Sequence, residues 1–199
     1  MVHTLPMAYL RPPTGPLTDG AASLRLPSVE AGDVETVTSY LEDEAQLEGT
    51  WLPLLPGGSA AESVRDWLEG WAGRRSQNGP MFAVTIPDEP RFVGIVGVGE
   101  PKDGTVEMVI GIAPRWRRRG LATRAVRLAA QWLLCLPGVS AAELRVDQGM
   151  VASQRVAESA RFRLAGTVSQ FVLGTGETFE DLRYVLAGPA SGDRICPPG

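Results

Sequence analysis

The sequence has very few of the residues on which several kinds of catalysis depend. It contains one histidine, His3, and two cysteines, Cys135 and Cys196. His3 lies in a proline-rich N-terminal segment, so the sequence lacks the histidines that zinc sites and Ser-His-Asp triads require. The cysteines form no CxxC pattern, and we expect no disulfide framework and a buried structural role for Cys135. Metal-dependent and thiol-dependent catalysis are therefore poor candidates, and no metal is expected.

Long apolar runs and a strong excess of basic charge are also missing. The longest apolar stretch, residues 121–136, is interrupted by Arg124, Arg127 and Gln131, well short of the roughly 18 residues of a membrane span. Residues 1–13 lack the basic leader and apolar core of a signal peptide, so we expect a cytoplasmic protein with no membrane partner. The net charge is −4, with 44% hydrophobic and 21% charged residues, which is typical of a soluble globular domain. This charge balance also gives no reason to expect a nucleic-acid partner.

The length of 199 residues corresponds to one domain plus tails, at about 150 residues per domain. Residues 1–22 contain four prolines and no hydrophobic period, which predicts a flexible tail. Residues 188–199 have the same character and predict a flexible C-terminal tail. One folded domain is therefore expected over residues 23–187, and no internal repeat divides it.

Within this domain, hydrophobic periodicity predicts both strands and helices. Runs rich in β-branched residues predict strands near residues 24–26, at 82–86, 92–98, 106–112 and 143–147, and in a final pair joined by the turn GTG at 174–176. Apolar stripes at helical spacing predict helices from an N-cap at Asp33, over 59–71, over 121–136 and over 151–160. The resulting fold class is α/β, with a mixed, mostly antiparallel central sheet flanked by helices and one parallel crossover.

The segment 109–125 predicts an anion site. A strand ends at Pro114, a basic loop follows, and a helix opens at Gly120. This arrangement leaves free backbone N–H groups and the positive end of the helix dipole for a phosphate. Gly120 and Ala122 leave room for a pyrophosphate near the main chain, and the arginines at 117–119 add charge-assisted hydrogen bonds. By contrast, the run GIVGVG at 94–99 lies inside a predicted hairpin strand with no helix behind it, so it fails the context test of a dinucleotide fingerprint.

The basic loop resembles the acetyl-CoA signature of the N-acetyltransferase (GNAT) superfamily, which is Gln or Arg, any two residues, Gly, any residue, and Gly or Ala. The matching residues are Arg117, Arg118, Arg119, Gly120, Leu121 and Ala122. About thirty residues later, ASQRVAESARF at 152–162 resembles a helix of the branch that includes ribosomal-protein N-terminal acetyltransferases. The final strands, with Asp181 and Tyr184, resemble the same branch, and the likeness covers about residues 23–187.

The resemblance implies a GNAT-like domain that binds acetyl-CoA as its cosubstrate. The backbone of Ile110 and Ile112 would pair with the pantetheine arm as an added strand would. The pyrophosphate would be held by the amides of Arg117, Arg118, Arg119, Gly120, Leu121, Ala122 and Thr123. Three positions depart from the branch pattern, because Met150 replaces an Asn, Ser159 replaces a common Lys and Arg161 replaces a Gly. The lost asparagine removes one polar contact from the cofactor region.

The implied reaction is attack of a neutral primary amine on the thioester, which needs a general base because a protonated amine has no lone pair. Glu107 matches an acidic residue of a family strand and is the candidate base; alternatively, it is simply a solvated strand residue. Ser153 matches a helix serine near the CoA sulfur and could donate a hydrogen bond to the departing thiolate. Alternatively, its hydroxyl satisfies backbone groups at the helix start. The tyrosine that is the general acid in many GNAT enzymes would fall at Ala157, so that role has no candidate.

The sequence leaves the amine acceptor open, although charge gives one indication. Residues 1–60 hold eight acids against Arg11 and Arg25, a local balance of 2 − 8 = −6. The resemblance puts the first two helices beside the acceptor cleft, so acidic residues there would favour a cationic small molecule or protein N-terminal amine. Solvated helix faces explain these acids equally well. The alternative function is a catalytically idle domain that binds and senses acyl-CoA, and a homodimer stays open because nothing in the sequence decides the oligomeric state.

Overall fold

Eight strands form one continuous sheet in the computed structural model, which describes residues 10, 12–25, 33–35, 38, 79–171, 178–189 and 196. The strands are β1 (Leu17–Thr18), β2 (Ser23–Arg25), β3 (Met81–Ile86), β4 (Glu89–Lys102), β5 (Thr105–Ile112), β6 (Ala141–Asp147), β7 (Arg163–Phe171) and β8 (Thr178–Ala187). The helices are the 3-10 helix η2 (Pro114–Trp116), α4 (Leu121–Cys135) and α5 (Val151–Ser159), and residues 33–35 and 38 are also helical. Across the sheet the strands lie in the order β1-β2-β3-β4-β5-β6-β8-β7. The predicted mixed, mostly antiparallel α/β fold is confirmed.

Strands β3, β4 and β5 form the predicted antiparallel meander, and β5 and β6 form the only parallel pair of the described sheet. Asp103 and Gly104 make the β4–β5 turn with φ angles of 51° and 77°, the positive values that a two-residue hairpin turn requires. The glycine-rich run at 94–99 lies inside β4, as predicted. A Cβ on Gly94 would collide with the Gly111 carbonyl oxygen of β5, so glycine here permits two backbones to approach closely.

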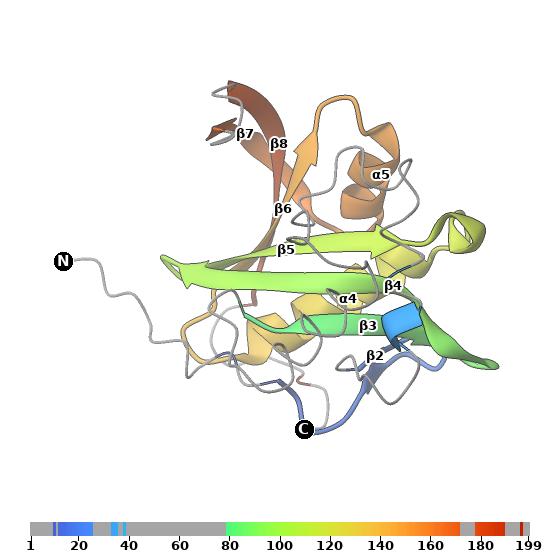
Figure 1. The fold of residues 1–199 in the computed structure, drawn as a ribbon. Helices are drawn as coiled ribbons and strands as arrows, with labels where there is room; N and C mark the ends of the chain where they lie inside the picture. Colours follow the sequence, from blue (N-terminus) through green and yellow to red (C-terminus); the bar gives the residue numbers. More distant parts are fainter. Residues whose placement is uncertain are drawn as a thin grey trace.

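Helix α4 covers one face of the sheet (Figure 1). Val126, Ala129 and Leu133 of its predicted apolar stripe are fully buried. Trp132 packs edge-on against Phe82 of β3, with ring centroids 5.3 Å apart. The strand residues that meet α4 include Val106, Met108 and Ile112 of β5 and Ala142, Leu144 and Val146 of β6. Because side chains alternate along a strand, the residues between these positions face the other side of the sheet.

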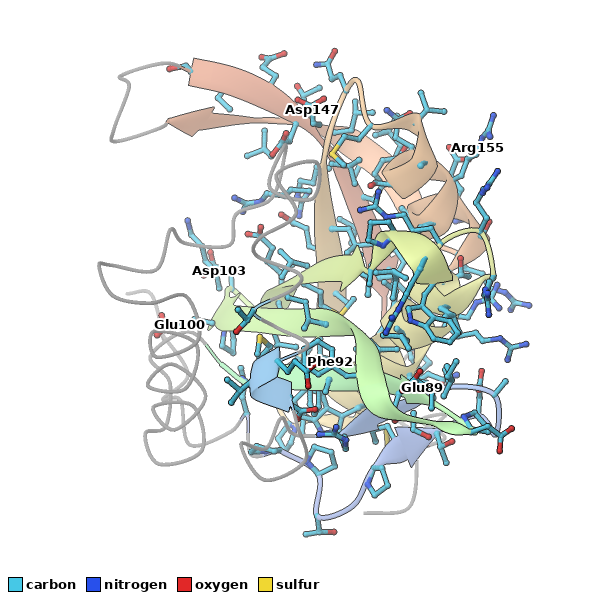
Figure 2. The ribbon with its side chains drawn as sticks, turned by 45° about the vertical axis from the view of Figure 1, so that its right-hand side comes forward. Glu89, Phe92, Glu100, Asp103, Asp147 and Arg155 are labelled. Atoms are coloured by element: carbon cyan, nitrogen blue, oxygen red, sulfur yellow. A yellow bond between two sulfur atoms is a disulfide. The ribbon has the colours of Figure 1, made fainter. Side chains whose placement is uncertain are left out.

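Helical residues 33–35 lie on that other side (Figures 1 and 2). There Asp33 forms a bidentate ion pair with Arg25 of β2, with both N–O distances at 2.7 Å. Asp33 is itself helical and fully buried. The prediction that Asp33 is the N-cap is therefore wrong. Its carboxylate reaches the half-buried guanidinium of Arg25 on the sheet, a contact that no local capping pattern contains.

Part of the N-terminal segment belongs to the domain, which corrects the prediction of a flexible tail over residues 1–22. Leu17 lies in β1, which pairs with β2, and the side chains of Leu10 and Leu17 are buried in the core. A tight turn closes this hairpin because Asp19 Oδ1 accepts hydrogen bonds from the N–H groups of Ala21 and Ala22 at 3.0 and 2.9 Å. Pro16 stands just before the strand, where proline is tolerated.

The C-terminal segment is tied to the domain as well. Cys196 forms a disulfide with Cys135 at the end of α4, with the Cα atoms 5.6 Å apart. This corrects the prediction of no disulfide. Of residues 188–199, predicted as a flexible tail, only 188, 189 and 196 are among the described residues, so that prediction stays open. The cysteines are separated by 61 residues, so the sequence does not show that they meet. Before this disulfide in the chain, β8 ends beside the start of β6, where the Gly188 N–H donates to the Ser140 carbonyl at 2.8 Å.

The remaining predicted helices and strands divide into two groups. The helices predicted over 121–136 and 151–160 are confirmed by α4 and α5. The helix predicted over 59–71 and the GTG turn at 174–176 lie outside the described residues. Among the helices that the structure describes, none has the length and apolar character needed to cross a membrane.

Candidate active site

Strands β5 and β6 pair over a short distance and then separate. Their parallel register ends at Met108↔Leu144 after four residue pairs. Figure 1 shows the two strands diverging toward their C-terminal ends. β6 continues beside β8 as far as Asp147, and β5 continues beside β4 as far as Ile112. Residues 109–112 of β5 therefore have no strand partner on the β6 side among the described residues, and an extended ligand could add there as a strand.

The backbone groups of Ile110 and Ile112 face this open edge. Residue pairs in an antiparallel ladder alternate between hydrogen-bonded and non-hydrogen-bonded. The Ala113 N–H donates to the Val93 carbonyl of β4 at 2.9 Å, so odd-numbered residues of β5 bond to β4 and even-numbered residues point away from it. Arg117 Nε donates to the Ile112 carbonyl at 2.9 Å. The backbone groups of Ile110 and Ile112 are thus oriented for pairing with an added strand, and one of the acceptors, the Ile112 carbonyl, is bonded to Arg117.

The loop that follows β5 presents the uncapped start of α4. Gly120 is the N-cap with φ 74°, in the left-handed region, and no side chain caps the first turn. The first N–H groups of the helix are therefore left for another acceptor. Arg117, Arg118 and Arg119 are exposed, and a Cβ on Gly120 would meet nothing within 4 Å. Within the described residues, the predicted anion site is a basic and open helix N-terminus, where the dipole favours negative charge.

Trp116 organises the arginines of this loop. The guanidinium carbon of Arg119 lies 4.6 Å from the centre of the Trp116 ring, and that of Arg115 lies 5.6 Å away. Both distances are those of cation–π contacts. The contacts restrain two long, charged side chains close to Gly120 in the sequence. Trp116 was not among the predicted site residues, although stacking of arginine on an aromatic ring is a recognised property of the guanidinium group.

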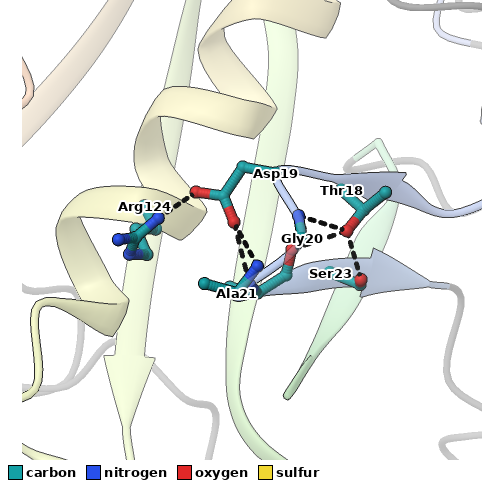
Figure 3. Close-up of polar contacts among 7 residues, drawn as sticks. Thr18, Asp19, Gly20, Ala21, Ser23 and Arg124 are labelled. Atoms are coloured by element: carbon teal, nitrogen blue, oxygen red, sulfur yellow. Dashed lines mark hydrogen bonds and ion pairs between the residues drawn. The ribbon is translucent and has the colours of Figure 1, made fainter. Parts of the chain in front are cut away.

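An acidic side chain from the N-terminal hairpin reaches the first turn of α4 (Figure 3). Asp19 Oδ2 lies 2.7 Å from Arg124 Nη1, while Oδ1 holds the hairpin turn. Burial raises the pKa of Asp19, but hydrogen bonds from Ala22, Arg124 and Ala21 outweigh burial, and the pKa is lowered. Asp19 is therefore an ionised partner of Arg124, and it offsets part of the positive charge at the start of α4.

The candidate base Glu107 lies on the sheet face opposite α4, beside charged residues of β6. In the parallel register it stands directly beside Glu143. Arg145 Nε lies 3.3 Å from Glu107 Oε2 and 3.0 Å from Glu143 Oε1, so one guanidinium contacts both carboxylates. Arg183 of β8 holds the other Glu143 oxygen at 2.6 Å. Glu107 is ion-paired and its side chain is only 36% exposed, which disfavours the alternative interpretation as a solvated strand residue.

These surroundings raise the pKa of Glu107 above its ordinary value of 4.5. Burial is the largest cause, and the negative charges of Glu143 and Asp181 add to the rise, while Arg145 opposes it by favouring the ionised form. A general base works best when its pKa approaches the operating pH. Glu107 therefore combines increased basicity with a position next to Met108, the last residue of β5 that pairs with β6.

Glu143, Arg145 and Arg183 were not predicted as site residues. Their signal in the sequence is charge within apolar strands, since Glu143 and Arg145 alternate with buried apolar residues of β6. Only the register between β5, β6 and β8 shows that these charges meet beside Glu107. In the described part of the chain, no three histidine, cysteine or acidic side chains are grouped so that they could hold a metal ion.

Ser153 lies in the first turn of α5, the helix that follows β6. The N-cap residue Met150 provides no side-chain cap. The Ser153 hydroxyl makes no hydrogen bond among the described residues, so the alternative role of satisfying backbone groups is not observed there. The same part of the chain shows no hydrogen bond between Ser153 and Glu107. Ala157 is fully buried and offers no polar group, while Arg155 points outward from α5 (Figure 2).

Comparison with known proteins identifies a family and several solved structures with the same fold. A family model described as an acetyltransferase (GNAT) domain matches residues 23–163. An acetyltransferase of the GNAT family from Bacillus anthracis has a similar structure, with a TM-score of 0.70 at 16% identity over 87% of this chain and 98% of that chain. Mycobacterium smegmatis RimJ in complex with CoA-disulfide gives a TM-score of 0.70 at 20% identity, over 87% of this chain and 86% of that chain.

A third structure in this group is the microcin C7 self-immunity acetyltransferase MccE in complex with acetyl-CoA and AMP. It gives a TM-score of 0.70 at 13% identity, over 90% of this chain and 99% of that chain. At such low identity, these similarities show a shared fold. Among curated proteins, none matches the sequence significantly.

Proposed function

The chain belongs to the acetyltransferase (GNAT) domain family, and we propose that it is an acetyl-CoA-dependent N-acetyltransferase that moves the acetyl group to a primary amine. One observation carries this proposal. The open backbone edge of β5 leads directly into a basic loop and an uncapped helix N-terminus. Acetyl-CoA has an amide-containing arm next to a pyrophosphate, so it needs an extended backbone edge followed by an anion site.

The residues present fit this cosubstrate. Ile110 and Ile112 would pair with the amides of the pantetheine arm, and Arg117 would release the Ile112 carbonyl that it now holds. The N–H groups of residues 118–123 would receive the pyrophosphate, with charge supplied by the arginines at 117–119. The Arg117 N–H, which the sequence also predicts as a phosphate donor, instead donates to the Pro114 carbonyl at 3.1 Å. Two of the structurally similar proteins were solved with CoA-disulfide and with acetyl-CoA, which supports a CoA-binding role for this fold.

Glu107 is proposed to take a proton from the incoming ammonium group. The neutral amine nitrogen then forms a bond to the thioester carbonyl carbon, and the carbon–sulfur bond breaks. Ser153 would donate a hydrogen bond to the departing thiolate. The second proton lost by the nitrogen goes to the thiolate or to solvent, which gives an amide and a free thiol. The backbone edge and the helix N-terminus would hold the cosubstrate in place during these steps, so that the amine meets a fixed carbonyl.

The proposed acceptor is a cationic small molecule or a protein N-terminal amine. Of the eight acids counted over residues 1–60, the structure describes Asp19, Asp33 and Glu35. Asp19 pairs with Arg124 and Asp33 with Arg25. The attraction that this segment offers to a cation is therefore smaller than the count of eight acids indicates. We also propose a cytoplasmic location. Because stable disulfides are rare in the cytosol, this location is tested by whether Cys135 and Cys196 are oxidised or reduced in cells.

Acetyl-CoA binding is tested by thermal unfolding of a matched pair of variants. A ligand that binds only the folded state at 100 times its Kd stabilises it by about 2.7 kcal/mol, on the order of 5 to 10 °C in Tm for a chain of this size. Gly120→Asp should abolish this shift because its carboxylate lies where the pyrophosphate would approach. Gly120→Asn has nearly the same shape and tolerates a positive φ equally well, so it should keep most of the shift. A wild-type shift in Gly120→Asp would contradict the assignment of the phosphate site, whereas a shift lost in both variants would show that bulk at Gly120 also blocks the pyrophosphate.

Turnover is tested by release of free thiol from acetyl-CoA across a library of amines. Thiol release that depends on one class of amine, with the acetylated amine found by mass spectrometry, is the expected result. A protein that shows the acetyl-CoA thermal shift but acetylates no amine would instead be the idle acyl-CoA-binding domain.

A further inference from the structure

Four charged side chains, one of which is the proposed base, alternate in sign across three neighbouring strands. In order they are Glu107 of β5, Arg145 and Glu143 of β6, and Arg183 of β8. We propose that Arg145 is a positioning residue of the acetyl transfer, which holds the Glu107 carboxylate at the opening between β5 and β6 and is itself held by Glu143. This inference rests on the proposed function, because it assumes that Glu107 is the base.

The sheet register places two carboxylates side by side, and Arg145 offsets their repulsion. Glu107 and Glu143 stand side by side on adjacent strands and on the same face. Two like charges in such a cross-strand position repel each other. Arg145 is two residues beyond Glu143, hence on the same face, and its Nε contacts one oxygen of each carboxylate at 3.3 and 3.0 Å. The guanidinium thus turns a repulsive pair into a bridged one.

The position of Arg145 also places it at the opening. The last paired residues of the two strands are Met108 and Leu144, so Arg145 is the first residue of β6 beyond the parallel pairing. β5 has turned away from β6 at this point (Figure 1). A side chain here can contact Glu107 from the side on which β5 loses its strand partner, which is the side proposed for the thioester.

Glu143 and Arg183 restrain Arg145 from behind. The Glu143 side chain is 5% exposed, and its two oxygens are divided between Arg145 Nε at 3.0 Å and Arg183 Nε at 2.6 Å. A buried carboxylate needs such partners, because an unpaired charge is costly to bury. Glu143 therefore holds Arg145 in place, because moving Arg145 away would leave one oxygen of the buried Glu143 carboxylate without its charged partner.

The charges that act on Glu107 come from two strands. Arg145 favours its ionised form, and Glu143 and Asp181 disfavour it. On β4 the neighbouring residue is Gly99, which brings no charge. Removing the cation should therefore raise the pKa of Glu107, and removing the adjacent anion should lower it. The two changes act with opposite signs on the same group.

The test compares pH profiles of kcat for the full-length protein on one amine at saturating concentration. Arg145→Gln should lower kcat at least tenfold at neutral pH and move the acidic limb of the profile to higher pH. Glu143→Gln should move the same limb downward. Arg145→Lys keeps the charge but not the planar fork, so it should lower kcat while leaving the limb close to its wild-type position. Because the amine is the same throughout, its own titration cancels in the comparison.

Arg163→Gln on β7 is the matched control, since Arg163 is exposed and lies outside the proposed machinery. It should leave both kcat and the limb unchanged. Limbs that coincide in wild type, Arg145→Gln and Glu143→Gln overturn the inference, even if kcat falls, because a purely structural role would lower kcat without moving them. If Arg145→Gln does not fold, the other two variants still test the inference. Glu143→Gln should move the acidic limb to lower pH, and Arg145→Lys should leave it near its wild-type position.

Failure of the proposed function would be distinguishable from failure of this inference. Wild type that acetylates no amine overturns the function and, with it, the catalytic role of Arg145. Carbon NMR titration of the Glu107 carboxyl group then reads the same two pKa shifts without turnover. Opposite shifts in Arg145→Gln and Glu143→Gln would support the bridging arrangement itself, and equal titrations would overturn it.

Discussion

Asp19 of the N-terminal hairpin and Arg124 of α4 form an ion pair, with 2.7 Å between Oδ2 and Nη1. The pair connects the β1–β2 hairpin to the first turn of the helix that carries the proposed phosphate site. Its side chains are 30% and 45% exposed. Exposed pairs contribute about 0 to 1 kcal/mol, so the contact places Arg124 more than it stabilises the domain.

Asp19→Asn should lower the free energy of unfolding by less than about 1 kcal/mol at neutral pH, because asparagine can keep the turn hydrogen bonds but loses the charge. The folded-state pKa of Asp19 is lowered from 3.8. Its ionised form therefore stabilises the fold above that pH, and the contribution is lost as the pH falls through the folded-state pKa. Urea unfolding at neutral and strongly acidic pH measures the difference between wild type and variant. A difference that persists in acid would assign the effect to the turn instead of the charge.

Arg161→Gly should raise the free energy of unfolding by up to about 1 kcal/mol. Arg161 follows the C-cap of α5, Ala160, and has φ 71°. Its N–H donates to the Glu158 carbonyl and the Phe162 N–H donates to the Ala157 carbonyl, which is a Schellman motif. A left-handed non-glycine residue costs about 1 to 2 kcal/mol, and the greater freedom of glycine in the unfolded chain offsets about 0.4 to 1 of this. Arg161→Ala removes the same side chain but keeps the strain, so it should give no gain in a urea titration. An equal gain in both variants would point to the charge of Arg161.

Local patterns were sufficient for most elements of the fold. The strands of the meander, helices α4 and α5, and the parallel crossover all follow from apolar periodicity and turn residues. The departure from the family pattern at Arg161 was visible as well, and the structure supplies its physical meaning, a left-handed backbone angle. What local patterns miss are contacts between segments distant in the chain. Leu17 joins the sheet only because β2 pairs with it, and Asp33 is buried only because Arg25 lies opposite.

Cys196→Ser should lower the free energy of unfolding under non-reducing conditions. The disulfide to Cys135 links residues 61 apart, and loop-closure entropy for such a loop corresponds to about 4 kcal/mol at most. The loss should disappear when wild type and variant are both unfolded in excess reductant. Counting thiols in denaturant gives a direct check, because two free thiols in unreduced wild type would contradict the pairing. The same count on freshly lysed cells bears on the proposed location, since stable disulfides are rare in the cytosol.

The candidate site was predictable to the extent that it lies in one continuous segment. The basic loop and Gly120 form such a segment, which is exposed and ends in an uncapped helix start; anion binding there stays a prediction. Glu107 was identified from its resemblance to a family strand, but its environment was not. That environment depends on which β6 and β8 residues stand beside it, and a shift of one residue in register would send Glu143 and Arg145 to the opposite face.

Glu107→Gln should slow turnover by about 10² to 10⁴, the usual contribution of a general base, with acetyl-CoA binding nearly unchanged. The loss should be largest at low pH, where the amine arrives protonated, and higher pH should restore part of the rate. Ser153→Ala should show a smaller loss with little restoration, because its proposed contact is with the leaving thiolate. Glu100→Gln is the control, since Glu100 is exposed on β4 near the hairpin end and has no proposed role (Figure 2).

The free energy of unfolding gives a second measurement for Glu107, because Glu107→Gln should lower turnover without lowering stability at neutral pH. Its folded-state pKa is raised above 4.5, so the folded protein binds this proton more tightly than the unfolded chain does. Wild type should therefore lose stability relative to Glu107→Gln as the pH rises from 4.5 through the folded-state pKa, and the variant should be at least as stable as wild type at neutral pH. A residue whose removal costs activity but not stability is maintained for the reaction. Should the variant instead unfold more easily at neutral pH and lose less than about tenfold in turnover, Glu107 would be a structural ion-pair partner, and another group would have to be the base.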